Sequence, residues 1–569
     1  MMIARKILCI LLLVFVIVIP SRAMGFDSII FSEGSSIQSY EDGTALWTEV
    51  TYISDKVING SYTFPEEVFT QTEDGKSLGS KRVIGFAAKD LEDETSWHND
   101  YDGVTQVILP SSYTMMPQNT FHLESILSSF DVKDGNPVLQ SVDGVLYDKQ
   151  DNRLVAYPNA RSDESYEVLA GTKVISPRAF GKNKHLKKIT LPDSLERIEH
   201  QGMRVGRQLK DLILPDNLKV IGRYAFEGTD LGHLHLPESL EFVDGNPFIF
   251  GIVPKLSVSE NHPVLMLAGG QVLFDKVRMS LLLYPTGTYT EKDYQVPAFV
   301  KTIGSGCFYN VDFTRVPVLQ LPEGLEEIHA KAFYSAKLSA IELPSSLKVL
   351  EYSAFLRAEG LKSIIIPSNI NTVSKWCFGL IDSLEEVVLQ EGVEKIDSAA
   401  FWTCSNIKTL SLPTTLKEIG EEAFVSCEQL QQLIFPEGIE VIGSHAFAHN
   451  YSLKQIILPS SMNQLGSAAF SYCKNINKIV IPGGIKRLKY ACFSNNSSLS
   501  EVSLAEGLEV IEGGVFENCP NLKSLILPRS LISLDESAFY NTPVTLKVYS
   551  GSTVEDLVKK AGLKFEVLP

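Results

Sequence analysis

Two histidines and one acidic stretch have the residue types and spacing that could bind a metal ion. His233 and His235 lie two residues apart, so in a strand both would point to one face and could share a metal. No third ligand is evident, and histidines on a strand usually face solvent. Residues 90–102 hold six acidic side chains, which offer oxygen ligands for calcium, but lack alternating aspartates closed by a glutamate. We expect a solvated loop there, with no metal site and no cofactor.

The sequence shows no catalytic constellation of a motif with its partner residues. It contains no HExxH zinc motif, no phosphate-binding loop and no dinucleotide fingerprint, and residues 75–79 match the bare GxSxG spacing alone. His445 and His449 flank a phenylalanine, a placement typical of turn residues. We therefore expect that the protein is not an enzyme.

The chain has eight cysteines, which in an exported protein would suggest disulfide bonds. Their spacing indicates another role. Four follow a phenylalanine by three residues, and asparagine takes the same position elsewhere: Cys404, Cys427, Cys473, Cys519, Asn450 and Asn496. Cys307, Cys377 and Cys492 instead directly precede a phenylalanine, and the eighth, Cys9, lies in an apolar run at the start of the sequence. We predict buried thiols, with the shared position facing inward and bonding the backbone, although neighbours such as Cys404 and Cys427 could form one incidental bridge.

A strict repeat determines where these side chains lie. In the C-terminal half of the chain, a phenylalanine that mostly follows a small residue recurs every 23 residues. The set is Phe378, Phe401, Phe424, Phe447, Phe470, Phe493, Phe516 and Phe539. A fixed period of this length indicates a solenoid, in which each coil is stable only when neighbouring coils cover its two faces.

The coil between Phe424 and Phe447 illustrates the pattern. An extended run ends at Pro436, because proline cannot donate a hydrogen bond to a sheet. The expected core side chains of this coil are Leu430, Leu433, Phe435, Ile439, Ile442, Ala446 and Phe447. Gly443 permits a tight turn beside them.

The repeat resembles a known family. L-x-x-I-x-L-P followed by I-G-x-x-A-F, and then by cysteine or asparagine, resembles the BspA-like class of bacterial leucine-rich repeats over most of the chain. The resemblance implies a leucine-rich repeat solenoid, rich in β-structure with short helical or 3-10 turns, coiled as a curved right-handed stack. It also implies a secreted or surface protein, and some members of the family look like adhesins for host matrix proteins.

The repeat and its interruptions divide the chain into seven segments. These are a signal peptide (1–23), an N-terminal cap with degenerate repeats (24–130), a β-hairpin insertion (131–165), repeats (166–255), a second hairpin insertion (256–290), repeats (291–545) and a C-terminal cap (546–569). In the N-terminal segment, residues 47–53 predict a strand and residues 82–86 the returning side of a coil. In the cap, 546–549 predict a final strand, and Ser552 and Gly562 bound a helix.

The first residues and the charge predict an exported protein. Arg5 and Lys6 precede the apolar run Ile7–Ile19, and small residues near Ala23 offer a cleavage site. The run has 13 residues, whereas a membrane-spanning helix needs about 20. The net charge of −17 disfavours nucleic acid and anionic membranes as partners. We expect a secreted or cell-surface protein, with no membrane contact beyond the signal peptide.

One face of the predicted strands forms a candidate binding surface. Side chains alternate in a strand, so the residue between the last two core positions points outward. In successive coils this outward position holds Ile365, Val388, Ser411, Ile434, Ile457, Val480, Ser503 and Ile526. Branched side chains suit any sheet, but a contiguous apolar row would also serve as a binding strip, which we expect on the concave side. The candidate residues are Ile365, Val388, Ile434, Ile457, Val480 and Ile526.

Two functions follow from this sequence. The leading one is an exported, adhesin-like binding protein that recognises an extracellular protein or glycan through a face of the solenoid. The alternative is an envelope scaffold whose coils pair with another copy or with other surface proteins. An enzyme or sugar-processing accessory is the least favoured class, because the sequence shows no catalytic constellation.

Overall fold

The computed structural model describes residues 105–114, 126–269, 271–285 and 294–569, together with the backbone of five earlier strands. The predicted leader and the acidic residues 90–102 lie outside the described residues. The chain forms two compact units, unit 1 (Met1–Pro263) and unit 2 (Val264–Pro569).

The N-terminal strands differ from the expected coil. β1 (Ser36–Ser39), β2 (Thr44–Glu49), β5 (Ser77–Phe86) and β4 (Glu67–Gln71) form one four-stranded sheet in that order. Residues 82–86, predicted as the returning side of a coil, instead belong to the ten-residue strand β5. This strand pairs with β2 in parallel and with β4 antiparallel, so it has a partner on both edges. The prediction was wrong because the local pattern does not show those partners.

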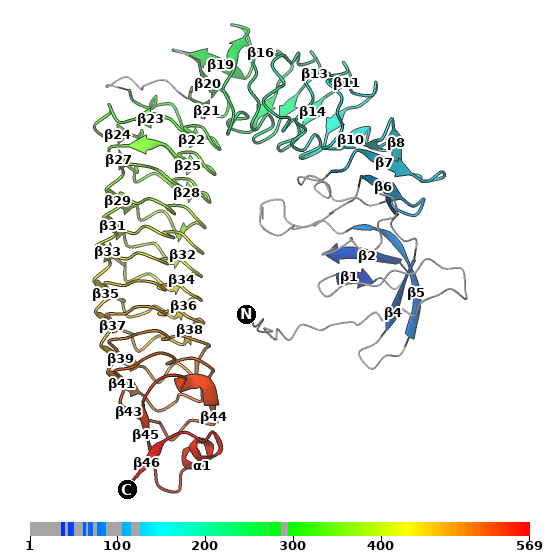
Figure 1. Cartoon of the computed structure of the whole chain (residues 1–569). Coiled ribbons are helices and arrows are strands. Elements are labelled where there is room, and N and C mark those ends of the chain that lie inside the picture. The colour runs from blue at the N-terminus through cyan, green and yellow to red at the C-terminus, as the bar shows by residue number, and fades with distance from the viewer. Residues whose placement is uncertain are drawn as a thin grey trace. The chain divides into compact units, whose positions relative to one another are not determined.

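Most regular coils contain two short strands, which pair in parallel with their equivalents in neighbouring coils to form several short sheets along the stack. The first comes from the L-x-x-I-x-L run, and we call the stack of these strands the first ladder. The second is a two-residue strand after the proline, and these stack as the second ladder. Figure 1 shows the two ladders of unit 2 along opposite edges of the coil stack, with β29 to β43 on one edge and β32 to β38 on the other.

The first ladder of unit 1 contains β3 (Ser61–Thr63), β6 (Gln106–Leu109), β7 (Ser129–Val132), β11 (Ser165–Glu167), β13 (Lys188–Thr190), β16 (His233–Leu236) and β18 (Lys255–Val258). The second ladder of unit 1 contains β12 (Val174–Ile175), β14 (Arg197–Ile198), β15 (Val220–Ile221) and β17 (Phe242–Val243).

The first ladder of unit 2 contains β24 (Leu319–Gln320), β27 (Ile341–Glu342), β29 (Ser363–Ile366), β31 (Glu386–Leu389), β33 (Thr409–Ser411), β35 (Gln432–Ile434), β37 (Gln455–Ile457), β39 (Lys478–Ile481), β41 (Glu501–Leu504), β43 (Ser524–Ile526), β45 (Thr545–Tyr549) and β46 (Phe565–Leu568). The second ladder of unit 2 contains β22 (Thr302–Ile303), β25 (Glu327–Ile328), β28 (Val349–Leu350), β30 (Thr372–Val373), β32 (Lys395–Ile396), β34 (Glu418–Ile419), β36 (Val441–Ile442), β38 (Gln464–Leu465), β40 (Arg487–Leu488), β42 (Val510–Ile511) and β44 (Ser533–Leu534). One further parallel pair joins β23 (Asp312–Phe313) and β26 (Lys337–Leu338), which directly precede β24 and β27 in the chain.

Two antiparallel meanders interrupt the coils. The first contains β8 (Leu139–Val142), β9 (Val145–Asp148) and β10 (Arg153–Ala156), and the second contains β19 (Leu265–Ala268), β20 (Val272–Asp275) and β21 (Ser280–Leu283). β10 then pairs in parallel with β12, and β21 with β22. Each insertion therefore supplies the strand on which the following second ladder begins.

The repeat phenylalanines form a continuous column inside unit 2. From Phe333 to Phe539 the stacked rings lie 4.7–5.9 Å apart between centroids, and their planes differ by 3–11°. All are buried. The column confirms the register predicted from the 23-residue spacing, because one ring from each coil occupies the same position.

The turn around each repeat phenylalanine is a tight backbone loop with two left-handed residues. Around Phe447 these are His445 (φ 56°) and His449 (φ 62°), so both histidines are turn residues as predicted. The amide of Phe447 donates to the carbonyl of Ala469 in the next coil at 2.9 Å. This third side of each coil therefore also stacks through hydrogen bonds. Among the described coils, one has a 3-10 helix here, η2 (Glu536–Phe539).

Glycine is required at position 443 for a different reason than the predicted tight turn. Its φ is not positive, but a Cβ atom at this position would lie 2.5 Å from the backbone nitrogen of Glu421 in the preceding coil. Gly420 and Gly466, at the same position in the neighbouring coils, meet backbone at 2.7 and 2.2 Å. Glycine is needed here because the coils approach closely.

The C-terminal cap contains the predicted helix and one unpredicted strand. α1 (Thr553–Lys560) begins after Ser552, whose Oγ accepts a hydrogen bond from the Glu555 amide at 3.3 Å. Gly562 (φ 66°) follows its end. The prediction that residues 546–549 form the final strand was wrong, because β46 pairs in parallel with β45 beyond the helix.

Candidate binding surface

The outward face of the first ladder is exposed, as the alternation of its side chains requires. In β35, Gln432 and Ile434 are exposed while Leu433 between them is buried. β29, β37 and β39 show the same alternation. The inward side chains join the phenylalanine column in one continuous core. The face therefore offers side chains to a partner without disturbing that core.

Five of the six predicted row residues are exposed to at least two fifths of their surface. The exposed fractions are 54% for Ile365, 76% for Ile434, 60% for Ile457, 44% for Val480 and 48% for Ile526. Val388 is half-buried. Large aliphatic side chains with this exposure, repeated at one register position, form an apolar row on an otherwise polar face.

The row is divided into short segments. Ile365 is the pairing partner of Val388, and Ile434 is the partner of Ile457. Ser411 follows Val388, and Ser503 follows Val480. The structure also ends one sheet at β37 and begins the next at β39, so Ile457 and Val480 lie on different hydrogen-bonded sheets. The longest apolar segment is thus Ile434, Ile457 and Val480, in three successive coils.

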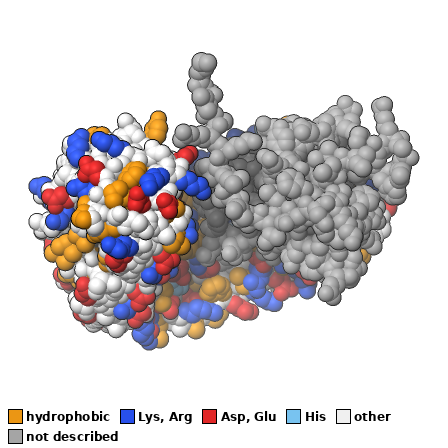
Figure 2. Space-filling view, turned by 90° about the horizontal axis from the view of Figure 1, so that it is seen from below, with side chains coloured by type: hydrophobic (Ala, Val, Ile, Leu, Met, Phe, Trp, Pro, Cys, Tyr) orange, Lys and Arg blue, Asp and Glu red, His pale blue; other side chains and the backbone are white. Residues whose placement is uncertain are grey.

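Polar side chains flank the row on the same strands. The outward position two residues earlier holds Glu386, Gln432, Gln455 and Lys478, all exposed. Lys478 Nζ lies 3.1 Å from Glu501 Oε2 in the next coil. Figure 2, which looks toward the C-terminal end of unit 2, shows basic and acidic side chains interspersed with small hydrophobic patches. The surface has no large region of one charge in this view.

The same position in unit 1 holds a residue that the sequence analysis missed. Ile213 lies between the buried Leu212 and Leu214 and is 85% exposed, the largest value among the exposed hydrophobic side chains. Continuing the register of the repeat into residues 209–215 would have identified it. His235, on β16, occupies the equivalent position one coil later.

The two histidines considered for metal binding are exposed on β16, on the same face as predicted. His235 Nδ1 lies 3.0 Å from Ser257 Oγ on the neighbouring strand. Within the described residues, no three histidine, cysteine or acidic side chains come close enough to hold a metal ion.

The cysteines at residues 307–519 are free and buried. Burial raises the pKa of the Cys404 and Cys473 thiols to about 12 and that of Cys519 to about 11. These thiols are therefore protonated at neutral pH and unreactive. The prediction that these cysteines are buried thiols is confirmed, and the neighbours Cys404 and Cys427 do not form a disulfide bond.

In the described part of the chain, no helix has the length and apolar character that crossing a membrane requires.

Comparison with known proteins agrees with the repeat. The family model of the BspA type leucine rich repeat region matches residues 156–256, 301–431 and 417–545. A search of curated proteins finds no significant match. Similar solved structures include a leucine-rich repeat protein from Eubacterium ventriosum ATCC 27560, with 18% identity, a TM-score of 0.42 and coverage of 75% of this chain and 95% of that one. A leucine-rich repeat protein from Bacteroides ovatus ATCC 8483 has 19% identity, a TM-score of 0.30 and coverage of 84% and 100%.

The matched ranges span more than half of the chain and coincide with the coils of both units. The leucine-rich repeat fold is typical of interaction scaffolds rather than enzymes. Proteins of this family are typically secreted or at the cell surface. This chain belongs to the family of BspA type leucine-rich repeat proteins.

Proposed function

We propose that this protein is an exported, adhesin-like binding protein that captures an extracellular protein or glycan. The apolar row of the first ladder would provide the centre of the contact, with Ile434, Ile457 and Val480 as its main residues. The observation that carries the proposal is the 76% exposure of Ile434 beside the 60% exposure of Ile457, its pairing partner. Large apolar side chains held side by side in water are typical of protein-binding surfaces.

The surroundings of the row support a macromolecular partner. A polar row of glutamine, lysine and glutamate side chains runs beside it, which resembles the apolar centre and polar rim of known interfaces. The repeat extends this arrangement over successive coils, so the contact can be long and shallow. Such a surface fits a protein or polymer better than a small molecule.

Export follows from the leader-like sequence, and the family's usual location agrees with it. A test is the mass of the protein recovered outside the cells that make it. We expect a chain that begins near residue 24, and a recovered protein beginning at Met1 would contradict export with cleavage.

Binding is tested by screening the purified mature chain against immobilised extracellular proteins and glycans. The variant Ile434→Thr, Ile457→Thr, Val480→Thr should lose most of the capture, because apolar burial contributes about 25 cal/mol per Å². The matched control is Gln432→Thr, Gln455→Thr, Lys478→Thr, which changes the neighbouring polar row. Equal loss in both variants would contradict a contact centred on the apolar row.

The scaffold alternative gives a different result in the same experiments. Self-association would appear as a concentration-dependent mass in solution, and a partner from the same cell would replace the extracellular ligand. Capture of a foreign extracellular protein by a monomeric chain would exclude it.

A further inference from the structure

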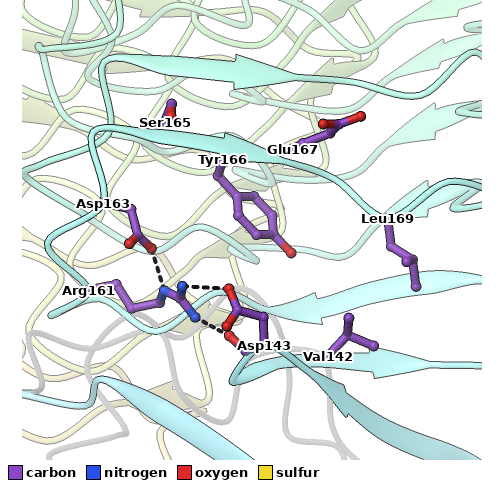
Figure 3. Close-up of a pocket in the computed structure, with 8 residues that line it drawn as sticks. All are labelled: Val142, Asp143, Arg161, Asp163, Ser165, Tyr166, Glu167 and Leu169. Carbon is purple, nitrogen blue, oxygen red and sulfur yellow. Dashed lines mark hydrogen bonds and ion pairs between the residues drawn. The ribbon is translucent and has the colours of Figure 1, made fainter.

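The first insertion leaves an opening in the first ladder of unit 1. β7 belongs to the sheet β3-β6-β7, whereas the next strand of the ladder, β11, belongs to a separate sheet with β13. A pocket of about 320 Å³ lies at this break, shown in Figure 3. Its lining residues are Val142, Asp143, Arg161, Asp163, Ser165, Tyr166, Glu167 and Leu169.

The backbone of β11 has one used edge and one open edge. Toward β13, the carbonyl of Glu164 accepts from Lys187 and the amide of Val168 donates to Thr190 at 3.0 Å. Backbone groups alternate in direction along a strand, so Ser165 and Glu167 direct theirs away from β13. Within the described part of the chain, no strand pairs with that edge. An unpaired strand edge beside a pocket is a template for another strand.

The opposite wall of the break is closed. The amide of Phe130 in β7 donates to the carbonyl of Gly144 at 2.8 Å, and Ser141 Oγ donates to the carbonyl of Phe130 at 2.7 Å. The β8–β9 turn therefore covers β7. Of the two strands on either side of the break, β11 is therefore the one with an unpaired backbone edge.

Arg161 holds the turn in place. Its Nε donates to Asp163 Oδ2 at 2.5 Å and its NH2 group to Asp143 Oδ2 at 3.0 Å, as Figure 3 shows. Its NH1 group also donates to the Asp143 carbonyl. The guanidinium is largely buried, with 15% of the side chain exposed, whereas the Asp143 side chain is 80% exposed. The hydrogen-bonding groups of Arg161 are thus used within the protein, and the acidic surface that solvent or a ligand can reach is that of Asp143.

The lining has an excess of negative charge. Asp143, Asp163 and Glu167 outnumber the single Arg161, and Glu167 is exposed on the outward face of β11. Tyr166 points into the pocket between β11 and the turn, and Val142 and Leu169 add apolar surface (Figure 3). The pocket therefore combines unpaired backbone groups, an apolar floor and acidic walls.

A comparison of the two insertions distinguishes the pocket residues that both share from those found in the first insertion alone. Tyr284 and Tyr294 pack at 4.9 Å and 70°, as Tyr157 and Tyr166 pack at 4.8 Å and 61° in the first. The aromatic pair is therefore part of the insertion's own packing. Asp143 and Arg161 are specific to the first insertion, because Gly270 takes the position of Asp143 in the second, and neither Thr288 nor Tyr289, which could align with Arg161, is basic. At the spacing of Tyr166 and Tyr294, Asp163 aligns with Glu291.

We propose that the open edge of β11 binds an extended peptide segment of a partner protein, with alternating apolar and basic residues, by strand addition. The peptide backbone pairs with Ser165 and Glu167, its apolar side chains enter the pocket against Tyr166, and its basic side chains face Glu167 and Asp143. This site is separate from the apolar row and does not depend on the function proposed for that row.

The probe is an acetylated, amidated pentapeptide Lys-Val-Lys-Val-Lys, with Glu-Val-Glu-Val-Glu and a backbone N-methylated form of the lysine peptide as controls. Amide hydrogen exchange of the full mature chain is followed by NMR with each peptide at about 1 mM, the range of weak strand additions. Without peptide, the amides of Ser165 and Glu167 should exchange faster than those of Tyr166 and Val168. The lysine peptide should slow the two exposed amides at least about twofold, and the controls should not.

Two variants of the chain separate pairing from charge. Glu167→Pro removes the outward amide without removing a bond to β13, so the sheet β11-β13 should remain while the effect of the peptide disappears. Glu167→Gln keeps the amide and should weaken the preference for lysine over glutamate peptide. Slow exchange of Ser165 and Glu167 before any peptide is added would overturn the proposal. So would unchanged exchange with the lysine peptide, or equal protection by its N-methylated form, and these results come from the wild-type chain even if Glu167→Pro fails to fold.

Discussion

The thiol of Cys473 donates a hydrogen bond to the carbonyl oxygen of Phe447, 26 residues earlier in the preceding coil, with an Sγ–O distance of 3.2 Å. The same bond recurs along the stack: Cys404 to Phe378 (3.0 Å), Asn450 to Phe424 (2.9 Å), Asn496 to Phe470 (3.0 Å) and Thr542 to Phe516 (2.6 Å). The position therefore requires a small donor. Asparagine adds a bond to its own coil but buries an oxygen without a partner in the described structure, which makes cysteine and asparagine near equivalents.

Exchanging the two residue types should change stability little. We expect Cys404→Asn and Cys519→Asn to alter the free energy of unfolding by less than about 1 kcal/mol, because each keeps the donor. Cys404→Ala leaves the Phe378 carbonyl without its partner and should cost about 1–3 kcal/mol. Urea unfolding measures all three. A collapse of the wild-type fold under mild reduction would show an essential disulfide and contradict this account.

Stability should fall in alkaline solution because burial raises the thiol pKa values. The Cys404 and Cys473 thiols have a pKa of about 12 in the fold against 9.0 when unfolded, so the folded state retains protons that the unfolded state releases. The stability that these two thiols contribute is fully present below pH 9 and is lost as the pH rises from about 9 to 12. The free energy of unfolding falls by up to roughly 1.4 kcal/mol per pH unit for each thiol. Urea midpoints at pH 8 and 10 measure the loss. The double variant Cys404→Asn, Cys473→Asn should lose less, and an equal loss would exclude these thiols as the cause.

Removing one ring from the phenylalanine column should weaken its own region most. Phe424→Ala leaves a cavity between Phe401 and Phe447 and should cost about 3–5 kcal/mol. Hydrogen exchange should accelerate mainly in the adjoining coils, since each coil contacts only its neighbours. The control Tyr540→Ala, at a ring that is 65% exposed, should have little effect. Uniform acceleration along unit 2 would contradict this local response.

Glycine should stabilise a left-handed turn position. Ala468 has φ 53°, where a Cβ atom is strained, so Ala468→Gly should gain about 0.5–1 kcal/mol. The adjacent Ala469 is buried without a positive φ, and Ala469→Gly should lose about 1 kcal/mol. Thermal or urea unfolding compares the pair. Destabilisation by Ala468→Gly would show that the strain at this turn is small.

The apolar row should be dispensable for folding. Ile434→Thr, Ile457→Thr and Val480→Thr together should change stability by less than about 1 kcal/mol, because the side chains are exposed and threonine suits a strand. The matched inward set Leu433→Thr, Ile456→Thr, Ile479→Thr should unfold the adjoining coils. Circular dichroism melting distinguishes the two. Unfolding of the outward variant would mean that these residues belong to the core.

The sequence alone determined the repeating part of this protein. A 23-residue period predicts which side chains share a position, and the column from Phe378 to Phe539, the Cys/Asn position and the outward row all follow from that register. It succeeds because every coil meets the same environment, so a residue type that recurs at one position reports one physical requirement.

Tertiary structure decided the features that depend on partners distant in the chain. The second ladder rests on strands as short as Val441–Ile442, too brief to show a period. The four-stranded sheet of β1, β2, β4 and β5 depends on pairings that no local pattern specifies. The opening beside β11 exists because Arg161 holds the turn at Asp143, 18 residues earlier, against β7's edge. Outside the repeat, contacts are set by where the chain folds back, and spacing in the sequence does not record that.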